Sequence, residues 1–165
     1  MPTYYFLPTR NVFGEGAVQE IGTLFGSLHV SRAMIVTDKF LAQSGMAEKI
    51  SGILAQSGIQ SVVFDGAEPN PTDKNVEAGV AFFHDNHCDS IVSLGGGSSH
   101  DCAKGIGLVA SNGGTIHDYE GVDRASRDVV PLMAINTTAG TASEITRFCI
   151  ITDTARKVKM CIVDW

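Results

Sequence analysis

Short runs of apolar residues alternate along the chain with longer segments whose apolar residues recur every three or four positions. The runs occupy residues 33–36, 61–64, 91–94 and 132–135. Runs of this length that are largely apolar are typical of strands buried on both faces. Each run therefore predicts one strand of a parallel sheet.

Three segments between these runs predict helices. The apolar residues of 46–57 share one helical face, and Gly58 follows as a stop. The second helix begins after Thr72, a favourable N-cap, with Asn75 at the capping-box position where Glu or Gln would be better. The third covers residues 98–109. Alternating strands and helices predict the α/β class, with a parallel sheet flanked by helices on both sides.

The two ends of the chain depart from this alternation. Residues 6–13 and 145–163 predict a β-ribbon, with short strands near residues 10–11 and 153–154. No internal repeat, low-complexity tract or linker interrupts the sequence, and 165 residues suffice for a domain with its own core. We therefore expect one domain over residues 1–165.

Composition narrows the class of protein. The chain is 44% hydrophobic and 18% charged, which is typical of a globular protein. Its formal charge is −6 and it has no basic stretch, which argues against a nucleic-acid or membrane-surface partner. No apolar run approaches the roughly 20 residues that span a bilayer, and the N-terminus lacks the pattern of a secretory signal. Four cysteines without C-x-x-C spacing predict reduced thiols, so we expect a cytoplasmic protein.

Three glycines end the third apolar run. Gly95, Gly96 and Gly97 would leave the sheet at the carboxyl end of a strand, where parallel sheets bind ligands. Glycine lets the backbone approach a ligand closely, and the start of the next helix offers unpaired N–H groups, with Ser98 and Ser99 able to cap it. The segment predicts a phosphate or pyrophosphate site, although it matches neither a P-loop nor the G-x-G-x-x-G fingerprint. A plain tight strand-to-helix turn is the alternative.

Polar residues also follow two other runs. Asp38 follows the first, where an acid can accept hydrogen bonds from ribose hydroxyls and would repel a 2′-phosphate, favouring NAD over NADP. An N-cap or solvated turn acid is the simpler alternative. Residues 136–144 follow the fourth run and carry four small hydroxyls, which suit phosphate oxygens or a Thr-rich turn. Three such features at three strand ends indicate one shared site.

The segments GGGSSHDCAKG and NTTAGTASE, together with EPNP at 68–71 and TD at 37–38, resemble the iron-dependent (group III) alcohol dehydrogenases. The resemblance is greatest to the branch that contains 1,3-propanediol dehydrogenase and lactaldehyde reductase. It covers essentially the whole chain and keeps the motifs in order. That family has an N-terminal Rossmann-like dinucleotide-binding domain and an all-helical C-terminal metal domain. The resemblance implies that this chain is the first of the two.

The resemblance also implies a set of cofactor-binding residues. Asp38 would hold the adenosine ribose of NAD, and Asn70 would lie near the adenine. The glycine turn, Ser98 and Asp101 would surround the pyrophosphate, and Lys159 would reach the nicotinamide ribose. Four threonines would line the diphosphate and nicotinamide end. The full set is Asp38, Asn70, Gly95, Gly96, Gly97, Ser98, Asp101, Thr137, Thr138, Thr141, Thr146 and Lys159.

By the same resemblance, the protein is an NAD-dependent alcohol dehydrogenase that transfers hydride reversibly between small alcohols or diols and NAD. The family's iron or zinc polarises the alcohol oxygen and is held by one Asp and three His residues of the helical domain. This chain ends at Trp165, before any of them. A truncated form lacking the metal site, or a catalytically silent dinucleotide-binding module, is the alternative. A sugar-phosphate or mononucleotide binder is a third possibility.

Other reactive side chains have simpler structural interpretations. His84 and His87 have a spacing that can chelate zinc, but a solvent-facing position and a helix end are favoured. His100 is a candidate general base, with a first-turn position near phosphate as the favoured interpretation. Burial is favoured over reactivity for Cys102, and a helix-start carboxylate over an acid–base role for Glu144. In the family that this chain resembles, the cofactor lies in the cleft between the two domains. A lone first domain would expose the apolar wall of that cleft, and such an exposed patch predicts a homo-oligomer.

Overall fold

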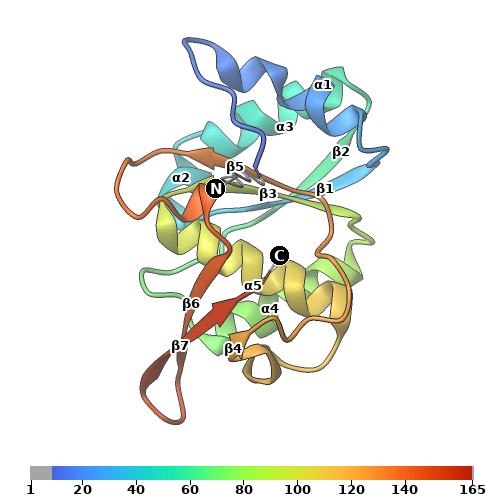
Figure 1. Ribbon diagram of the computed structural model, residues 1–165. Helices are drawn as coiled ribbons and strands as arrows, with labels where there is room; N and C mark the ends of the chain where they lie inside the picture. The colour runs from blue at the N-terminus through green and yellow to red at the C-terminus, as the bar shows by residue number, and fades with distance from the viewer. Residues whose placement is uncertain (1–8, 165) are drawn as a thin grey trace, which may run out of the picture.

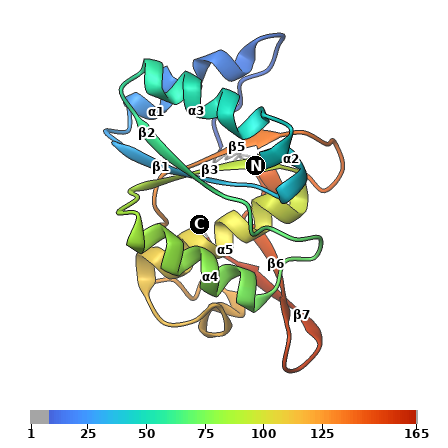
Figure 2. The ribbon, with the colours of Figure 1, turned by 180° about the vertical axis from the view of Figure 1, so that it is seen from behind.

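A computed structural model describes residues 9–164 of the protein. These residues form three layers, with a central sheet between two layers of helices (Figures 1 and 2). The helices are α1 (Ile21–Gly26), α2 (Lys39–Gln43), α3 (Met46–Gln56), α4 (Asp73–Asp85) and α5 (Gly97–Asn112), with the 3₁₀ turns η1 (Ala17–Glu20), η2 (Ile116–Tyr119) and η3 (Ser143–Ile145). The strands are β1 (Arg32–Val36), β2 (Gln60–Phe64), β3 (Ser90–Gly95), β4 (Gly121–Val122), β5 (Leu132–Asn136), β6 (Phe148–Asp153) and β7 (Val158–Val163).

The central sheet has four parallel strands in the order β2-β1-β3-β5. The chain moves outward from β1 to β2, then crosses back to β3 on the other side of β1 and continues to β5. The strand order therefore reverses between β1 and β3. In sheets of this kind, the crevice at the carboxyl ends of those two strands is where ligands bind. All four predicted strands and the parallel sheet are confirmed.

Each face of the sheet carries its own apolar core. Helices α1 and α3 cover one face, and α4 and α5 cover the other (Figures 1 and 2). Alternate residues of the two central strands point to opposite faces, because side chains along a strand alternate. Met34 and Ile91 pack on the side of α4 and α5, whereas Ile35 and Val92 pack on the side of α1 and α3. The predicted α/β class with helices on both faces is confirmed.

The start of α4 is fixed by the capping box that the sequence predicts. Thr72 Oγ1 accepts a hydrogen bond from the Asn75 backbone N–H at 3.2 Å, and Asn75 Oδ1 accepts one from the Thr72 backbone N–H at 2.8 Å. The asparagine side chain therefore reaches as far as this box requires. This cap sets the position of the loop that precedes it, which carries Asn70.

The C-terminal part of the predicted β-ribbon is confirmed. Strands β6 and β7 form an antiparallel hairpin that packs beneath α5, and β4 pairs with β7 to complete a second, three-stranded sheet. The N-terminal part is different: residues 9–13 contain no strand, so the short strand expected near residues 10–11 is not formed, and residues 6–8 lie outside the described residues. The ribbon is therefore a C-terminal feature in the part of the chain that is described.

Candidate functional site

The glycine turn lies at the carboxyl end of β3, beside the point where the strand order reverses. Gly95 has φ +149°, a conformation that side chains rarely adopt. A Cβ on Gly96 would lie 2.5 Å from Thr138 Oγ1, and a Cβ on Gly97 would lie 2.5 Å from Thr141 Oγ1. The loop after β5 therefore packs so closely on the turn that a Cβ at either position would displace a threonine side chain. The backbone of the turn is left without side chains of its own.

Helix α5 begins at Gly97 without a side-chain cap. Its N-cap is Gly96, which has no side chain to accept hydrogen bonds from the first-turn N–H groups. Ser98 and Ser99 lie inside the first turn, and Ser99 is buried against Gly95. The expectation that these serines cap the helix is therefore wrong. Uncapped amides at a helix start attract an anion, because their N–H dipoles point outward from the helix end.

A buried hydroxyl at the same edge has no partner. Thr37 follows β1 directly and is fully buried, and its Oγ1 accepts and donates no hydrogen bond within residues 9–164. Buried polar groups are nearly always hydrogen-bonded, to protein or to ordered water. An unmet hydroxyl beside a bare glycine turn fits an edge built to receive a polar ligand.

Asp38 is the N-cap of α2. Its Oδ1 accepts a hydrogen bond from the Leu41 backbone N–H at 2.8 Å, and the residue is half-buried. The N-cap role that the sequence offers as the simpler alternative is therefore present in the structure. This hydrogen bond uses only one of the two carboxylate oxygens, so the N-cap role is compatible with a ribose-binding role.

Asn70 and Lys159 are joined to each other. The Lys159 ammonium donates a hydrogen bond to Asn70 Oδ1 at 2.7 Å, which ties β7 to the loop before α4. Asn70 has φ +55°, a left-handed conformation that asparagine tolerates. The family resemblance implies that Asn70 lies near the adenine and Lys159 near the nicotinamide ribose. The structure joins the two side chains, and their places relative to a bound cofactor stay predictions.

Asp101 faces the inside of the protein. Its Oδ1 accepts a hydrogen bond from Ser143 Oγ at 2.6 Å, and its Oδ2 accepts one from the Ile150 backbone N–H at 3.2 Å. Lys104 lies 3.8 Å from Oδ1. These contacts fasten α5 to η3 and β6. Both carboxylate oxygens of Asp101 are thus engaged by the protein, and its place around a pyrophosphate stays a prediction.

The four predicted threonines all lie on the exposed segment between β5 and β6. The backbone N–H of Thr137 donates to Gly95 O at 2.9 Å, which holds this segment against the glycine turn. Thr138 and Thr141 touch the turn, as described above. Thr146 lies beyond η3, where its carbonyl accepts from the Lys104 ammonium at 3.0 Å. The first three therefore share one site with the glycines, and Thr146 extends it along the chain.

A large cleft opens on the outer side of β5. Its volume is about 940 Å³. Thr137, Thr138, Thr146 and Glu144 line it, together with apolar residues of α1 and β5. The glycine turn and Asp38 do not. The cleft therefore adjoins the predicted phosphate site through its threonines and places Glu144 in reach of whatever occupies it.

His100 is enclosed beneath the turn. Its Nδ1 lies 2.6 Å from Ser93 Oγ on β3, and its Nε2 lies 3.1 Å from Asn136 Oδ1 on β5. Because an amide oxygen only accepts, Nε2 carries the proton and Nδ1 accepts from the serine. The sequence placed His100 near the phosphate. The structure instead makes it a buried link between two strands, with a pKa lowered first by burial.

This burial predicts a dependence of stability on pH. Since the pKa of His100 is lower in the folded state than in the unfolded chain, its contribution is complete above the unfolded value, about 6.5, and is lost as the pH falls below it. The limiting slope is about 1.4 kcal/mol per pH unit. We expect His100→Gln to lose less stability than the wild type between pH 7 and pH 5, measured by urea unfolding. His84→Gln, which changes an exposed histidine, is the control; equal losses in all three would contradict the prediction.

The other reactive side chains have structural roles or none. Cys102 is fully buried, and burial raises the pKa of its thiol to about 12, so it is not a nucleophile. His84 and His87 are exposed, the second at the end of α4 with φ +52°, and they form no ligand cluster. Within residues 9–164 no three imidazoles converge with an aspartate. The described residues therefore do not fit the one-Asp, three-His metal set that the resemblance implies.

The strand order and the bare glycine turn define a doubly wound, Rossmann-like α/β protein. Residues 8–165 match the model of the iron-containing alcohol dehydrogenase family. The chain belongs to that family of oxidoreductases, as its motifs indicate. None of the described helices is long and apolar enough to cross a membrane.

Several proteins are similar to this chain over nearly all of its length. It is 49% identical to the NAD-dependent methanol dehydrogenase of Bacillus methanolicus and 46% identical to the 1,3-propanediol dehydrogenase of Citrobacter freundii, each over 98% of this chain and 42% of the relative. A crystal structure of 1,3-propanediol oxidoreductase superposes with a TM-score of 0.94 at 44% identity, over 100% of this chain and 43% of that one. Sulfoacetaldehyde reductase from Bifidobacterium kashiwanohense, solved in complex with NAD⁺, gives a TM-score of 0.88 at 31% identity, over 99% and 43%. The chain thus spans about two fifths of the length of these relatives.

Proposed function

We propose that this chain is the NAD-binding domain of an alcohol dehydrogenase that acts on small alcohols or diols and their aldehydes. The observation that carries the proposal is the bare glycine turn at the point where the strand order reverses, with two threonines packed on it. The named relatives support it, since one is an NAD-dependent methanol dehydrogenase and one structure contains NAD⁺. Asp38 at the end of β1 favours NAD over NADP.

Residues of this chain contact the cofactor at three places. The uncapped amides at the start of α5 hold the pyrophosphate, and Thr138 and Thr141 add hydroxyl donors beside them. Asp38 accepts from the adenosine ribose. Lys159, positioned by Asn70, supplies a positive charge at the rim. When bound, the nicotinamide supplies the hydride acceptor for alcohol oxidation. The residues described here orient that cofactor.

Calorimetric titration of the chain with NADH tests this function. We expect saturable binding that AMP competes for, because both ligands present an adenosine ribose to Asp38. Binding of AMP or a sugar phosphate with no binding of NADH at millimolar concentration would favour the mononucleotide alternative and overturn the proposal. Alcohol oxidation with and without added Fe²⁺ or Zn²⁺ then separates a working enzyme from a catalytically silent module.

We also propose that the protein is cytoplasmic and self-associates. The four cysteines are all free thiols, which suits a reducing compartment. Large apolar side chains are exposed around the cleft beside β5, including Phe13 at 88%, Val12 at 42% and Ile145 at 40%. Contiguous apolar surface of this kind drives association. Light scattering at micromolar concentration should give a mass of two copies or more, and a clean monomer would contradict this prediction.

A further inference from the structure

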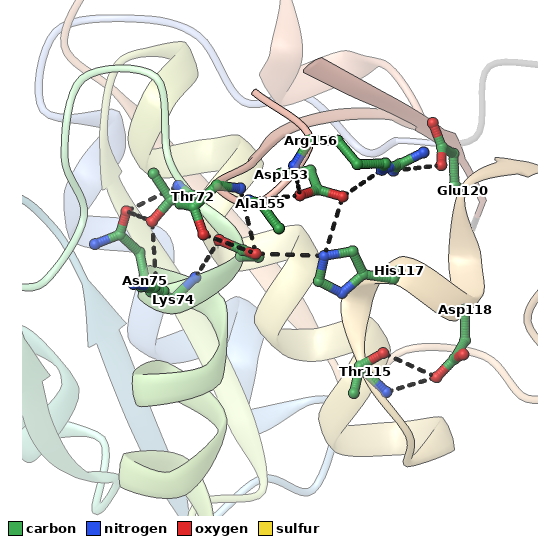
Figure 3. A network of polar contacts seen from close by, with 12 residues as sticks. Thr72, Lys74, Asn75, Thr115, His117, Asp118, Glu120, Asp153, Ala155 and Arg156 are labelled. Atoms are coloured by element: carbon green, nitrogen blue, oxygen red, sulfur yellow. Dashed lines mark hydrogen bonds and ion pairs between the residues drawn. The ribbon is translucent and has the colours of Figure 1, made fainter. Parts of the chain in front are cut away.

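Three potential metal ligands meet where the β6–β7 hairpin touches the helical layer. His117 extends from η2 toward Asp153 at the end of β6, in a network that also contains Arg156 and Glu120 (Figure 3). Asp73, the first residue of α4, completes the group. The donor atoms of the three residues all lie within 4.8 Å of one another. They come from positions far apart in the sequence, so only the folded chain assembles them.

The distances suit a shared cation better than hydrogen bonds. His117 Nε2 lies 3.3 Å from Asp73 Oδ2 and 3.4 Å from Asp153 Oδ2. Both are longer than usual N–H···O distances, and a neutral ring offers one Nε2 proton for two oxygens. Zinc bonds to nitrogen and oxygen of about 2.0–2.1 Å in a tetrahedron place neighbouring ligand atoms about 3.3–3.4 Å apart. The imidazole nitrogen thus stands at this spacing from each of the two carboxylates, and all three donor atoms lie within 4.8 Å of one another.

Neighbouring groups hold both carboxylates in position. Asp153 is buried, and its Oδ1 accepts from the backbone N–H groups of Ala155 and Arg156 at 2.9 and 2.8 Å. Its Oδ2 accepts from the Arg156 side chain. Asp73 Oδ2 accepts from the Thr154 hydroxyl at 3.2 Å. Ligating carboxylates in metal sites are usually hydrogen-bonded in this way, which fixes their orientation.

The charge around the group is negative. Two aspartates meet there, and the one nearby guanidinium, that of Arg156, is shared with Glu120 at 2.7 Å. His117 is 41% exposed, which leaves an open side for an entering ion and for water. Oxygen and imidazole donors in this mixture suit Zn²⁺ and other divalent ions of the first transition row.

We propose that Asp73, His117 and Asp153 bind a divalent transition-metal ion such as Zn²⁺, with water in the remaining position. The ion would join α4, η2 and the β6–β7 hairpin at one point. The hairpin already docks there through the hydrogen bond from the Thr152 backbone N–H to Pro71 O at 2.8 Å. Because the site does not exist in the unfolded chain, the ion would bind only the folded chain and would therefore raise its free energy of unfolding.

Zn²⁺ titration of the chain, followed by calorimetry and by melting temperature, tests the proposal. We expect saturable binding that raises the melting temperature, and at least about a tenfold loss of affinity in His117→Gln and Asp73→Asn. Each variant retains a side chain of similar size, and Asn at position 73 can still accept from Thr154. His84→Gln, an exposed histidine elsewhere on the surface, is the matched control and should bind as the wild type does.

Co²⁺ gives a second measurement that does not depend on stability. A tetrahedral nitrogen and oxygen site should produce visible absorption in the wild type that is absent in His117→Gln. No saturable binding by the wild type, or equal Zn²⁺ affinity in His117→Gln, would overturn the proposal. In that case the cluster is a set of polar contacts between the His117 ring and two aspartates.

Discussion

Gly97→Ala is expected to weaken NADH binding by about tenfold or more. The added Cβ would lie 2.5 Å from Thr141 Oγ1 and 2.8 Å from its Cγ2, so the loop after β5 would have to leave the turn. Overpacking of this kind costs about 1–3 kcal/mol, and 1.4 kcal/mol corresponds to a factor of ten in affinity. The methyl group would also cover the first amides of α5, which hold the pyrophosphate in our proposal. Calorimetric titration with NADH measures the change directly.

The effect on affinity can be separated from an effect on folding. Gly97 is the first residue of α5, and alanine favours a helix over glycine, so the helix itself is not weakened by the change. Gly140→Ala is the matched control, because Gly140 lies in the loop after β5 that packs on Gly97, and a Cβ at position 140 meets nothing within 4 Å. It should bind NADH as the wild type does. Unchanged affinity in Gly97→Ala would show that the turn does not hold the cofactor.

The elements that could be predicted from sequence are those whose signals are local. Strand β3 is a continuous apolar run, and α4 begins at a Thr72–Asn75 pair that forms its box within four residues. Helix α1 was missed, because it has six residues and its burial depends on distant contacts. Gly22 on this helix packs against Ser57, and a Cβ there would have no room. Strand β4 was missed because it has two residues and exists only by pairing with β7.

The candidate site shows the same division. The glycine run and Asp38 could be found because each stands within two residues of the end of an apolar run, and parallel strands bring their carboxyl ends together. The orientation of a side chain in the first turn of α5 could not be found. His100 and Asp101 are neighbours in that turn, yet one bonds to β3 and β5 and the other to η3 and β6. The rotation of α5 about its own axis decides which way each side chain points, and that rotation depends on how α5 packs against its neighbours.

The Asp73, His117 and Asp153 cluster carried no signal in the sequence. Its members are separated by 44 and 36 residues, and none stands in a recognised metal spacing. Asp153 caps the turn between β6 and β7, because its Oδ1 accepts hydrogen bonds from the backbone N–H groups of Ala155 and Arg156. Its place in the cluster depends on where the β6–β7 hairpin docks, and short-range sequence patterns do not reveal that position.

Asp38→Asn is expected to raise the affinity for NADPH relative to NADH by about tenfold. A carboxylate at the ribose position repels a 2′-phosphate, and removing one charge–charge contact at partial burial is worth on the order of 1.4 kcal/mol. Asparagine is the informative replacement because it is an equally good N-cap. It preserves the hydrogen bond that Asp38 Oδ1 accepts from Leu41, so α2 stays in place while the charge is removed. Titrations with both cofactors at one ionic strength give the ratio of affinities.

The control for this substitution is Asp65→Asn. Asp65 is an exposed acid that follows β2, at the same edge of the sheet but at its outer strand. Removing its charge changes the net charge of the protein by the same amount without touching the ribose position, so an effect of net charge alone would appear in both variants. A shift confined to Asp38→Asn places the 2′ position of the ribose beside this carboxylate. A ratio unchanged by Asp38→Asn would leave Asp38 with its N-cap role alone, and the preference between NAD and NADP would have to come from other residues at the rim.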